Sequence, residues 1–194
     1  MLTENLHHKF SHIHKVISTE KFLNKEALGG EIPFWISTYD PKQEVGVEKE
    51  IENLQRRLEN EGLNTLLINL FALCMQIVDE TIGLDKIFEI EKKKTKERFK
   101  NALQSTINIH ERLIPNIKYQ VYEKKPKALI LNGVGSVFPF IRSHNVLNNL
   151  QSAVKEIPTL MFFPGIYTGH SLELFGLLKD DNYYRAFNID SYKM

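Results

Sequence analysis

The amino-acid sequence predicts an α/β fold with a mostly parallel central sheet of about five strands and helices on both faces. Apolar runs of strand length recur along the chain, and segments with apolar residues at every third or fourth position separate them. Gly or Pro follows most of these runs. Strands that alternate with helices pair in parallel and are covered on both faces. The same order of elements would also suit a degenerate P-loop-like arrangement.

The first half of the chain contains two predicted strands. Leu6, Phe10, Ile13 and Ile17 recur at helical spacing, which predicts an amphipathic helix near the N-terminus. Residues 32–39 read as the first strand, and residues 45–60 as a helix that ends at Gly62. Residues 66–70 form the second predicted strand, which continues into a helix.

The second half is charged at first and then becomes apolar. Residues 87–113 predict one long helix closed by Pro115, and an extended segment is expected at residues 119–122. Further strands are expected at residues 128–132, 159–163 and 183–189, with a helix over residues 143–154.

Length and composition indicate one soluble cytoplasmic domain, residues 1–194, with an N-terminal helical segment (1–30) and an α/β core (31–194). The chain carries 25 Lys+Arg and 24 Asp+Glu, so its net charge of +1 favours no nucleic-acid, membrane or acidic partner globally. The single cysteine, Cys74, rules out an internal disulfide and lies in an apolar run, where we expect it to be buried. No signal pattern or apolar run of membrane-spanning length is present.

The loop after the first predicted strand is where a nucleotide-binding α/β protein places its phosphate loop. Here residues 39–48 contain one glycine, Gly46, and no Gly-Lys-Ser or Gly-Lys-Thr sequence. The acids Asp40, Glu44 and Glu48 would repel phosphate. A working P-loop ATPase is therefore disfavoured.

Two other patterns match chemical motifs only in part. Gly133 and Gly135 match half of a dinucleotide fingerprint, but Phe138 occupies the third glycine position, so a tight turn is favoured. His8 and His12 are four residues apart on a predicted helix and could present two metal ligands, but a solvated helix face is favoured. We assign no metal site, no cofactor and no catalytic residue.

A basic run occupies residues 92–98. Glutamates interleave with it, which suits pairing along an exposed helix better than contact with phosphates. Its weak nucleic-acid candidates are Lys92, Lys93, Lys94 and Lys96.

Arg142, His144 and Arg185 lie within otherwise apolar blocks, where polar groups need partners. One interpretation is an anion or carboxylate site at the sheet edge. The other is a set of structural bridges to Asp40, Asp180, Asp181 or Glu173.

Several sequence blocks together resemble the BrxB family of bacteriophage exclusion (BREX) defence systems, a domain-of-unknown-function family. The blocks are Tyr39-Asp-Pro41, Leu131-Asn-Gly-Val-Gly-Ser-Val-Phe-Pro-Phe-Ile-Arg-Ser-His144, Leu147-Asn-Asn-Leu-Gln151, Phe163-Pro-Gly-Ile-Tyr167, Leu174-Phe-Gly176 and Asp181-Asn-Tyr-Tyr-Arg-Ala-Phe187. The resemblance spans residues 32–189. It implies a small protein encoded with a large ATPase, an adenine methyltransferase and an alkaline-phosphatase-like protein, and acting within their assembly. It implies no catalytic residues.

Three functional hypotheses follow. The favoured one is a non-enzymatic adaptor that holds BREX components together, either as a monomer or as a homo-oligomer. An alternative is a domain that binds a nucleotide or phosphorylated ligand at the sheet edge through Asn132, Gly133, Gly135, Arg142 and His144. The third is a subunit that contacts DNA through the Lys-rich helix. The partner- or ligand-binding candidates are Asn132, Gly133, Gly135, Phe138, Phe140, Arg142, His144, Tyr167, Tyr183 and Arg185.

Overall fold

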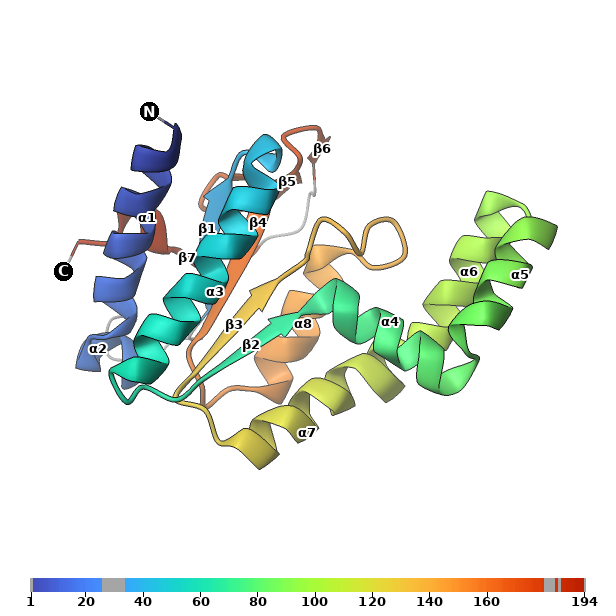
Figure 1. The fold of residues 1–194 in the computed structure, drawn as a ribbon, viewed down its shortest axis with the longest axis horizontal. Coiled ribbons are helices and arrows are strands. Elements are labelled where there is room, and N and C mark those ends of the chain that lie inside the picture. Colours follow the sequence, from blue (N-terminus) through green and yellow to red (C-terminus); the bar gives the residue numbers. More distant parts are fainter. Residues whose placement is uncertain (1, 26–33, 180–183, 185, 194) are drawn as a thin grey trace.

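The computed structural model describes residues 2–25, 34–179, 184 and 186–193. Figure 1 shows the arrangement of its helices and strands. The helices are α1 (Leu2–Ile17), α2 (Glu20–Leu23), α3 (Glu44–Asn60), α4 (Leu70–Thr81), α5 (Leu84–Lys93), α6 (Lys96–Ile107), α7 (Ile114–Lys124) and α8 (Ser143–Ala153). The strands are β1 (Phe34–Tyr39), β2 (Thr65–Asn69), β3 (Ala128–Asn132), β4 (Thr159–Tyr167), β5 (Leu172–Leu174), β6 (Leu178–Lys179) and β7 (Phe187–Asn188). Short helical turns cover Pro41–Gln43, Ile109–Leu113 and Ile189–Ser191.

Five of the strands form a parallel sheet in the order β2-β3-β4-β1-β7. The long strand β4 lies between β3 and β1, with Leu160 beside both Ile130 and Trp35. Beyond the parallel region, β4 pairs with β5 in antiparallel fashion, and β5 pairs with β6. The predicted α/β class, with a mostly parallel sheet of about five strands, is therefore confirmed.

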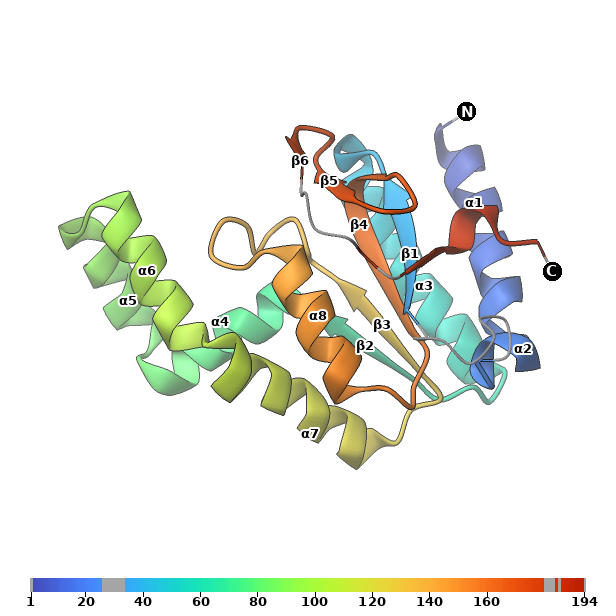
Figure 2. The ribbon, with the colours of Figure 1, turned by 180° about the vertical axis from the view of Figure 1, so that it is seen from behind.

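Helices cover both faces of the sheet, as predicted. Helices α1 and α3 pack on one face, and α4, α7 and α8 pack on the other (Figures 1 and 2). Successive side chains of a strand point to opposite faces, so Trp35 packs beneath α1 and α3 while Ile36 joins the other core. Both side chains are at most 1% exposed, which explains why the strands read as continuous apolar runs.

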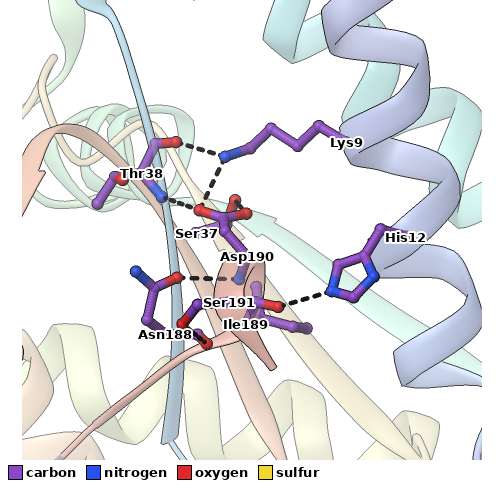
Figure 3. A network of polar contacts seen from close by, with 8 residues as sticks. All are labelled: Lys9, His12, Ser37, Thr38, Asn188, Ile189, Asp190 and Ser191. Carbon is purple, nitrogen blue, oxygen red and sulfur yellow. Dashed lines mark hydrogen bonds and ion pairs between the residues drawn. The ribbon is translucent and has the colours of Figure 1, made fainter. Parts of the chain in front are cut away.

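The outer edge of β1 is closed by polar contacts rather than by a full strand (Figure 3). Beyond the short pairing with β7, the Thr38 N–H donates to the Asp190 carboxylate at 3.1 Å. Lys9 on α1 donates to the Thr38 carbonyl at 2.6 Å and forms an ion pair with Asp190 at 2.8 Å. The Ser37 hydroxyl also donates to Asp190, and His12 Nε2 lies 3.0 Å from the Ile189 carbonyl oxygen. These contacts satisfy backbone groups that an open sheet edge would expose.

The prediction of one helix over residues 87–113 is wrong. Helix α5 ends at Lys93, and Thr95 begins α6 by accepting a hydrogen bond from the Arg98 N–H. Asn108, with φ of 32°, then ends α6, and its side chain accepts from the Glu111 N–H at 3.2 Å. Short polar side chains compete for backbone donors in this way, so they divide a run whose apolar spacing alone predicts continuity.

Two further predictions need correction. The segment 119–122 is helical rather than extended, because Pro115 lies in the first turn of α7 instead of ending the preceding helix. Proline is tolerated there because the first helical N–H groups have no intrahelical partner. The predicted strand over residues 183–189 is shorter and covers Phe187–Asn188. Residues 183 and 185 lie outside the described residues.

Candidate functional site

A groove lies between the N-terminal end of α8 and the β5–β6 hairpin. Its cavity volume is about 240 Å³. Apolar side chains and two cations line it: Phe138, Arg142, Ser143, Leu172, Leu174, Leu177, Leu178 and Lys179.

The hairpin is placed by the way β4 leaves the sheet. Gly165 on β4 pairs with Leu174, and at φ of 151° it lies so close to the Glu173 carbonyl oxygen that a Cβ would collide with it. The turn that follows has Phe175 at φ of 60° and Gly176 at φ of 67°. A left-handed conformation is uncommon for a bulky residue such as Phe175 and costs about 1–3 kcal/mol. Strain of this kind is often found at functional sites.

The end of β4 and the β5–β6 hairpin expose large apolar side chains. Leu177 is 81% exposed, and Ile166, Leu178 and Phe175 are between 36% and 50% exposed. Two of these residues, Leu177 and Leu178, also line the groove. Exposed apolar side chains that gather beside charged groups are typical of an interaction site.

Among the described residues that line the groove, the charged side chains are those of Arg142 and Lys179. Arg142 is exposed, directly precedes α8, and forms no ion pair with a described residue. Lys179 lies 3.8 Å from the Glu173 carboxylate, which neutralises it in part. The N-terminus of α8 adds a positive partial charge beside Arg142. The bridges proposed from sequence between Arg142 and Asp40 or Glu173 are not formed, and Asp180 and Asp181 lie outside the described residues.

The other candidates from the sequence lie in different surroundings. Phe138 and Arg142 line the groove, whereas Phe140 packs against the core and His144 is half-buried in the first turn of α8. Tyr167 is buried, and its hydroxyl donates to the Ala186 carbonyl at 2.7 Å, which ties the segment before β7 to β4. Tyr183 and Arg185 lie outside the described residues.

The Gly133–Gly135 turn contacts the protein's own atoms. A Cβ on Gly133 would collide with Oδ1 of Asn69, the side chain that caps α4 by accepting from the Ala72 N–H. A Cβ on Gly135 would lie 2.9 Å from Pro164 Cγ and 3.0 Å from Phe175 Cε1. These contacts favour the interpretation as a tight turn with close packing. The turn also supports Phe175 at the base of the hairpin.

The loop after β1 is acidic and bonded to itself. The Tyr39 hydroxyl donates to Glu44 at 2.9 Å, and the Asp40 carboxylate accepts from the Lys42 N–H at 3.0 Å. Burial raises the pKa of Glu44, and burial together with the charge of Glu44 raises the pKa of Tyr39. This loop offers an anion little attraction.

Three remaining expectations concern the burial of Cys74, a metal site and a membrane-spanning helix. Cys74 is fully buried, and burial raises the pKa of its thiol to about 12, so it packs as a small apolar residue. His12 contacts the Ile189 carbonyl, and among the described residues no group of three or more His, Cys, Asp or Glu side chains could hold a metal ion. No described helix has the length and apolar character needed to cross a bilayer.

Sequence reasoning did not identify Leu177, Leu178 and Lys179 as groove residues. Their signal is weak, because the segment from Leu174 to Lys179 resembles an ordinary apolar turn around Gly176. Only the return of β5 against β4 brings them beside Phe138.

The region of the chain that forms the groove is similar to known proteins. The family model described as BREX protein BrxB matches residues 66–189, which include the whole groove. The chain belongs to the BrxB family. A BREX protein BrxB from Bacillus cereus (strain H3081.97) is 40% identical over 175 residues, covering 89% of this chain and 91% of the relative. A BREX protein BrxB from Escherichia coli O9:H4 (strain HS) is 30% identical over 189 residues, covering 97% of this chain and 94% of the relative. No solved structure matches the chain.

Proposed function

We propose that this protein acts in BREX phage defence as a non-enzymatic adaptor that holds other BREX components together. Membership of the BrxB family supports the defence role, because the relatives named BREX protein BrxB align with nearly the whole chain. The adaptor role rests on the groove and on the exposed hairpin beside it.

The exposed apolar hairpin is the observation that carries the proposal. A partner that covers Leu177 and Leu178 removes apolar surface from water. Full burial of an exposed leucine contributes about 1.5–3 kcal/mol, and Leu178, which is 42% exposed, contributes less than Leu177. Arg142 and Phe138 in the same groove are residue types that often anchor interfaces. Apolar side chains at the centre with a cation at the rim are typical of a partner-binding surface.

Polar groups at the strand ends also support a structural role. Asn69 caps α4, Asp40 closes the turn after β1, and Tyr167 holds the segment before β7. Each of these side chains forms hydrogen bonds within the fold that hold neighbouring elements in place.

The test is co-purification of the full chain with each BREX component separately: the alkaline-phosphatase-like protein, the large ATPase and the methyltransferase. The groove variant combines Leu177→Ser, Leu178→Ser and Arg142→Ala. The control variant is Val45→Ser, which removes an 81% exposed apolar side chain from α3 on the opposite face of the sheet.

We expect the native protein and the control to retain at least one component and the groove variant to bind it at least tenfold more weakly. Retention of every partner by the groove variant would show that the interface lies elsewhere. If the native protein retains none of the components, the adaptor role is wrong.

A second candidate function is binding of a nucleotide or phosphorylated ligand at the carboxyl end of β3. One observation favours it: the side chain of Asn132 is 6% exposed, and its Oδ1 accepts no hydrogen bond from a described residue. A buried acceptor without a donor is unfavourable and is often satisfied by water or a ligand. Millimolar nucleotides should then raise the melting temperature of the native protein but not of Asn132→Ala. An unchanged melting temperature of the native protein would exclude this function.

A further inference from the structure

Helices α5 and α6 form an antiparallel hairpin that extends from the body of the molecule, away from the sheet (Figures 1 and 2). We call residues 92–100, which join the end of α5 to the start of α6, the basic tip. From its charge and exposure we propose that the basic tip binds the phosphate backbone of double-stranded DNA without reading its sequence.

The charge of the chain is distributed unevenly. The basic tip contains six cations (Lys92, Lys93, Lys94, Lys96, Arg98 and Lys100) and one acid (Glu97), which gives it a net charge of +5. Since the whole chain carries +1, the remaining residues sum to −4. A small region of strong positive charge on a protein that is otherwise slightly acidic directs the tip toward polyanions.

The division of the predicted long helix concentrates these cations. On one continuous helix they would spread along its length, with a glutamate near most of them. The break at residues 94 and 95 instead places the last turn of α5 and the first turn of α6 around one projecting turn. The N-terminus of α6 lies in the same turn and favours anions through its partial positive charge.

Most of the cations are available to a ligand. Lys92 and Lys93 share one carboxylate, Glu89, at 3.1 and 3.5 Å. Lys94, Lys96 and Arg98 are exposed, and none forms an ion pair with a described residue. Pairs between exposed groups contribute little, so phosphate can displace Glu89 at small cost.

The composition of the tip favours nucleic acid over an acidic protein surface. Protein interfaces are depleted in Lys and have an apolar centre, and the one large apolar residue of the tip, Phe99, is half-buried against the core. Phosphate backbones, in contrast, are bound by exposed Lys and Arg without apolar contact. Proteins that bind single strands combine cations with exposed aromatic side chains on which bases stack. Residues 92–100 contain no exposed aromatic side chain, so a duplex fits the tip better.

The experiment measures binding of the full chain to a fluorescent DNA duplex of about 20 base pairs by anisotropy, at salt concentrations from about 50 to 200 mM. The test variant combines Lys94→Gln, Lys96→Gln and Arg98→Gln. The control variant combines Lys15→Gln, Lys49→Gln and Lys193→Gln, which removes the same charge from exposed positions on α1, α3 and the C-terminal segment.

With about four phosphate contacts, affinity for the duplex should fall roughly 100-fold over that salt range. The test variant should bind at least tenfold more weakly at low salt, and its slope of log affinity against log salt should shrink by about 2.7. Two duplexes of unrelated sequence should bind equally, and the control should bind like the native protein. Absence of binding by the native protein at low salt, or an equal loss in the test and control variants, would overturn the proposal. Neither result bears on the groove, which lies outside the basic tip.

Discussion

Asp190 fixes the C-terminal turn to the edge of β1 and to α1. Its carboxylate accepts from Ser37, Thr38 and Lys9, at distances between 2.8 and 3.1 Å. Asp190→Ala leaves all three donors without this partner, so we expect a loss of about 2–3 kcal/mol in the free energy of unfolding, measured by urea titration. Glu52→Ala, which removes an exposed carboxylate from α3, should change stability by less than about 0.5 kcal/mol. Equal effects of the two substitutions would show that the network contributes little.

Gly133 provides a second test at a single position. Gly133→Ala meets both a left-handed backbone (φ of 72°) and a collision with Asn69, whereas Gly169→Ala has φ of 92° but open space around its Cβ. The conformational cost of either substitution is about 1–2 kcal/mol. We expect Gly133→Ala to cost about 1 kcal/mol more, because displacing Asn69 removes the cap of α4. Similar urea midpoints for the two variants would contradict close packing at this turn.

Glu44 makes stability depend on pH with a defined sign. Burial raises its pKa in the folded protein above the ordinary value of about 4.3 in the unfolded chain. Between these two values the folded protein binds more protons than the unfolded chain, so stability falls as pH rises through this window. Glu44→Gln keeps an acceptor for Tyr39 but cannot ionise. When the pH is raised from below this window to above it, the urea midpoint of the variant should therefore fall less than that of the native protein. Glu123→Gln, at an exposed position on α7, should follow the native profile.

Secondary-structure elements were predictable where apolar spacing and chain breaks agree. Strand β3 is buried at all five positions and was expected from an uninterrupted apolar run, and α3 matches the spacing of Val47, Ile51 and Leu54. The division of residues 87–113 into separate helices was not predictable from spacing. Apolar residues recur at helical spacing throughout this segment, whereas the caps at Thr95 and Asn108 divide it.

The groove residues, too, could be predicted from the sequence only in part. Phe138 and Arg142 could be selected because each belongs to a distinctive block that follows a buried strand. Leu177 and Leu178 could not, since their role depends on the antiparallel return of β5 against β4, which involves residues distant from Phe138 in the sequence. Asp190 was missed for a related reason: its partners on β1 and α1 lie between about 150 and 180 residues earlier in the chain.

Across the whole molecule, α1 and the C-terminal turn Ile189–Ser191 lie side by side next to β1 (Figure 1). The rings of Phe22, Phe187 and Tyr192 surround Trp35 with centroids 5.0 to 5.8 Å away, which joins α2, β7 and the C-terminal segment to β1. Phe10 on α1 stacks on Phe162 of β4, at 5.4 Å. The N-terminal helix is therefore part of one core and also supports the C-terminal turn.

This arrangement predicts that the α/β core does not fold without α1. Removal of residues 1–17, which contain α1, uncovers the surface beneath Phe10, Ile13, Val16 and Ile17, which are each at most 2% exposed. At about 1.5–3 kcal/mol for each buried side chain, the loss approaches the 5–15 kcal/mol that stabilises a typical domain.

We expect the truncated chain to lose cooperative thermal unfolding, followed by circular dichroism. Phe10→Ala in the full chain should lower the free energy of unfolding by about 3–5 kcal/mol. This single substitution keeps the test informative if the truncated chain cannot be purified. Cooperative unfolding of the truncated chain near the native melting temperature would instead mean that α1 is an appendage to an autonomous core. The contacts of Lys9 and His12 with the C-terminal turn would then contribute little to folding.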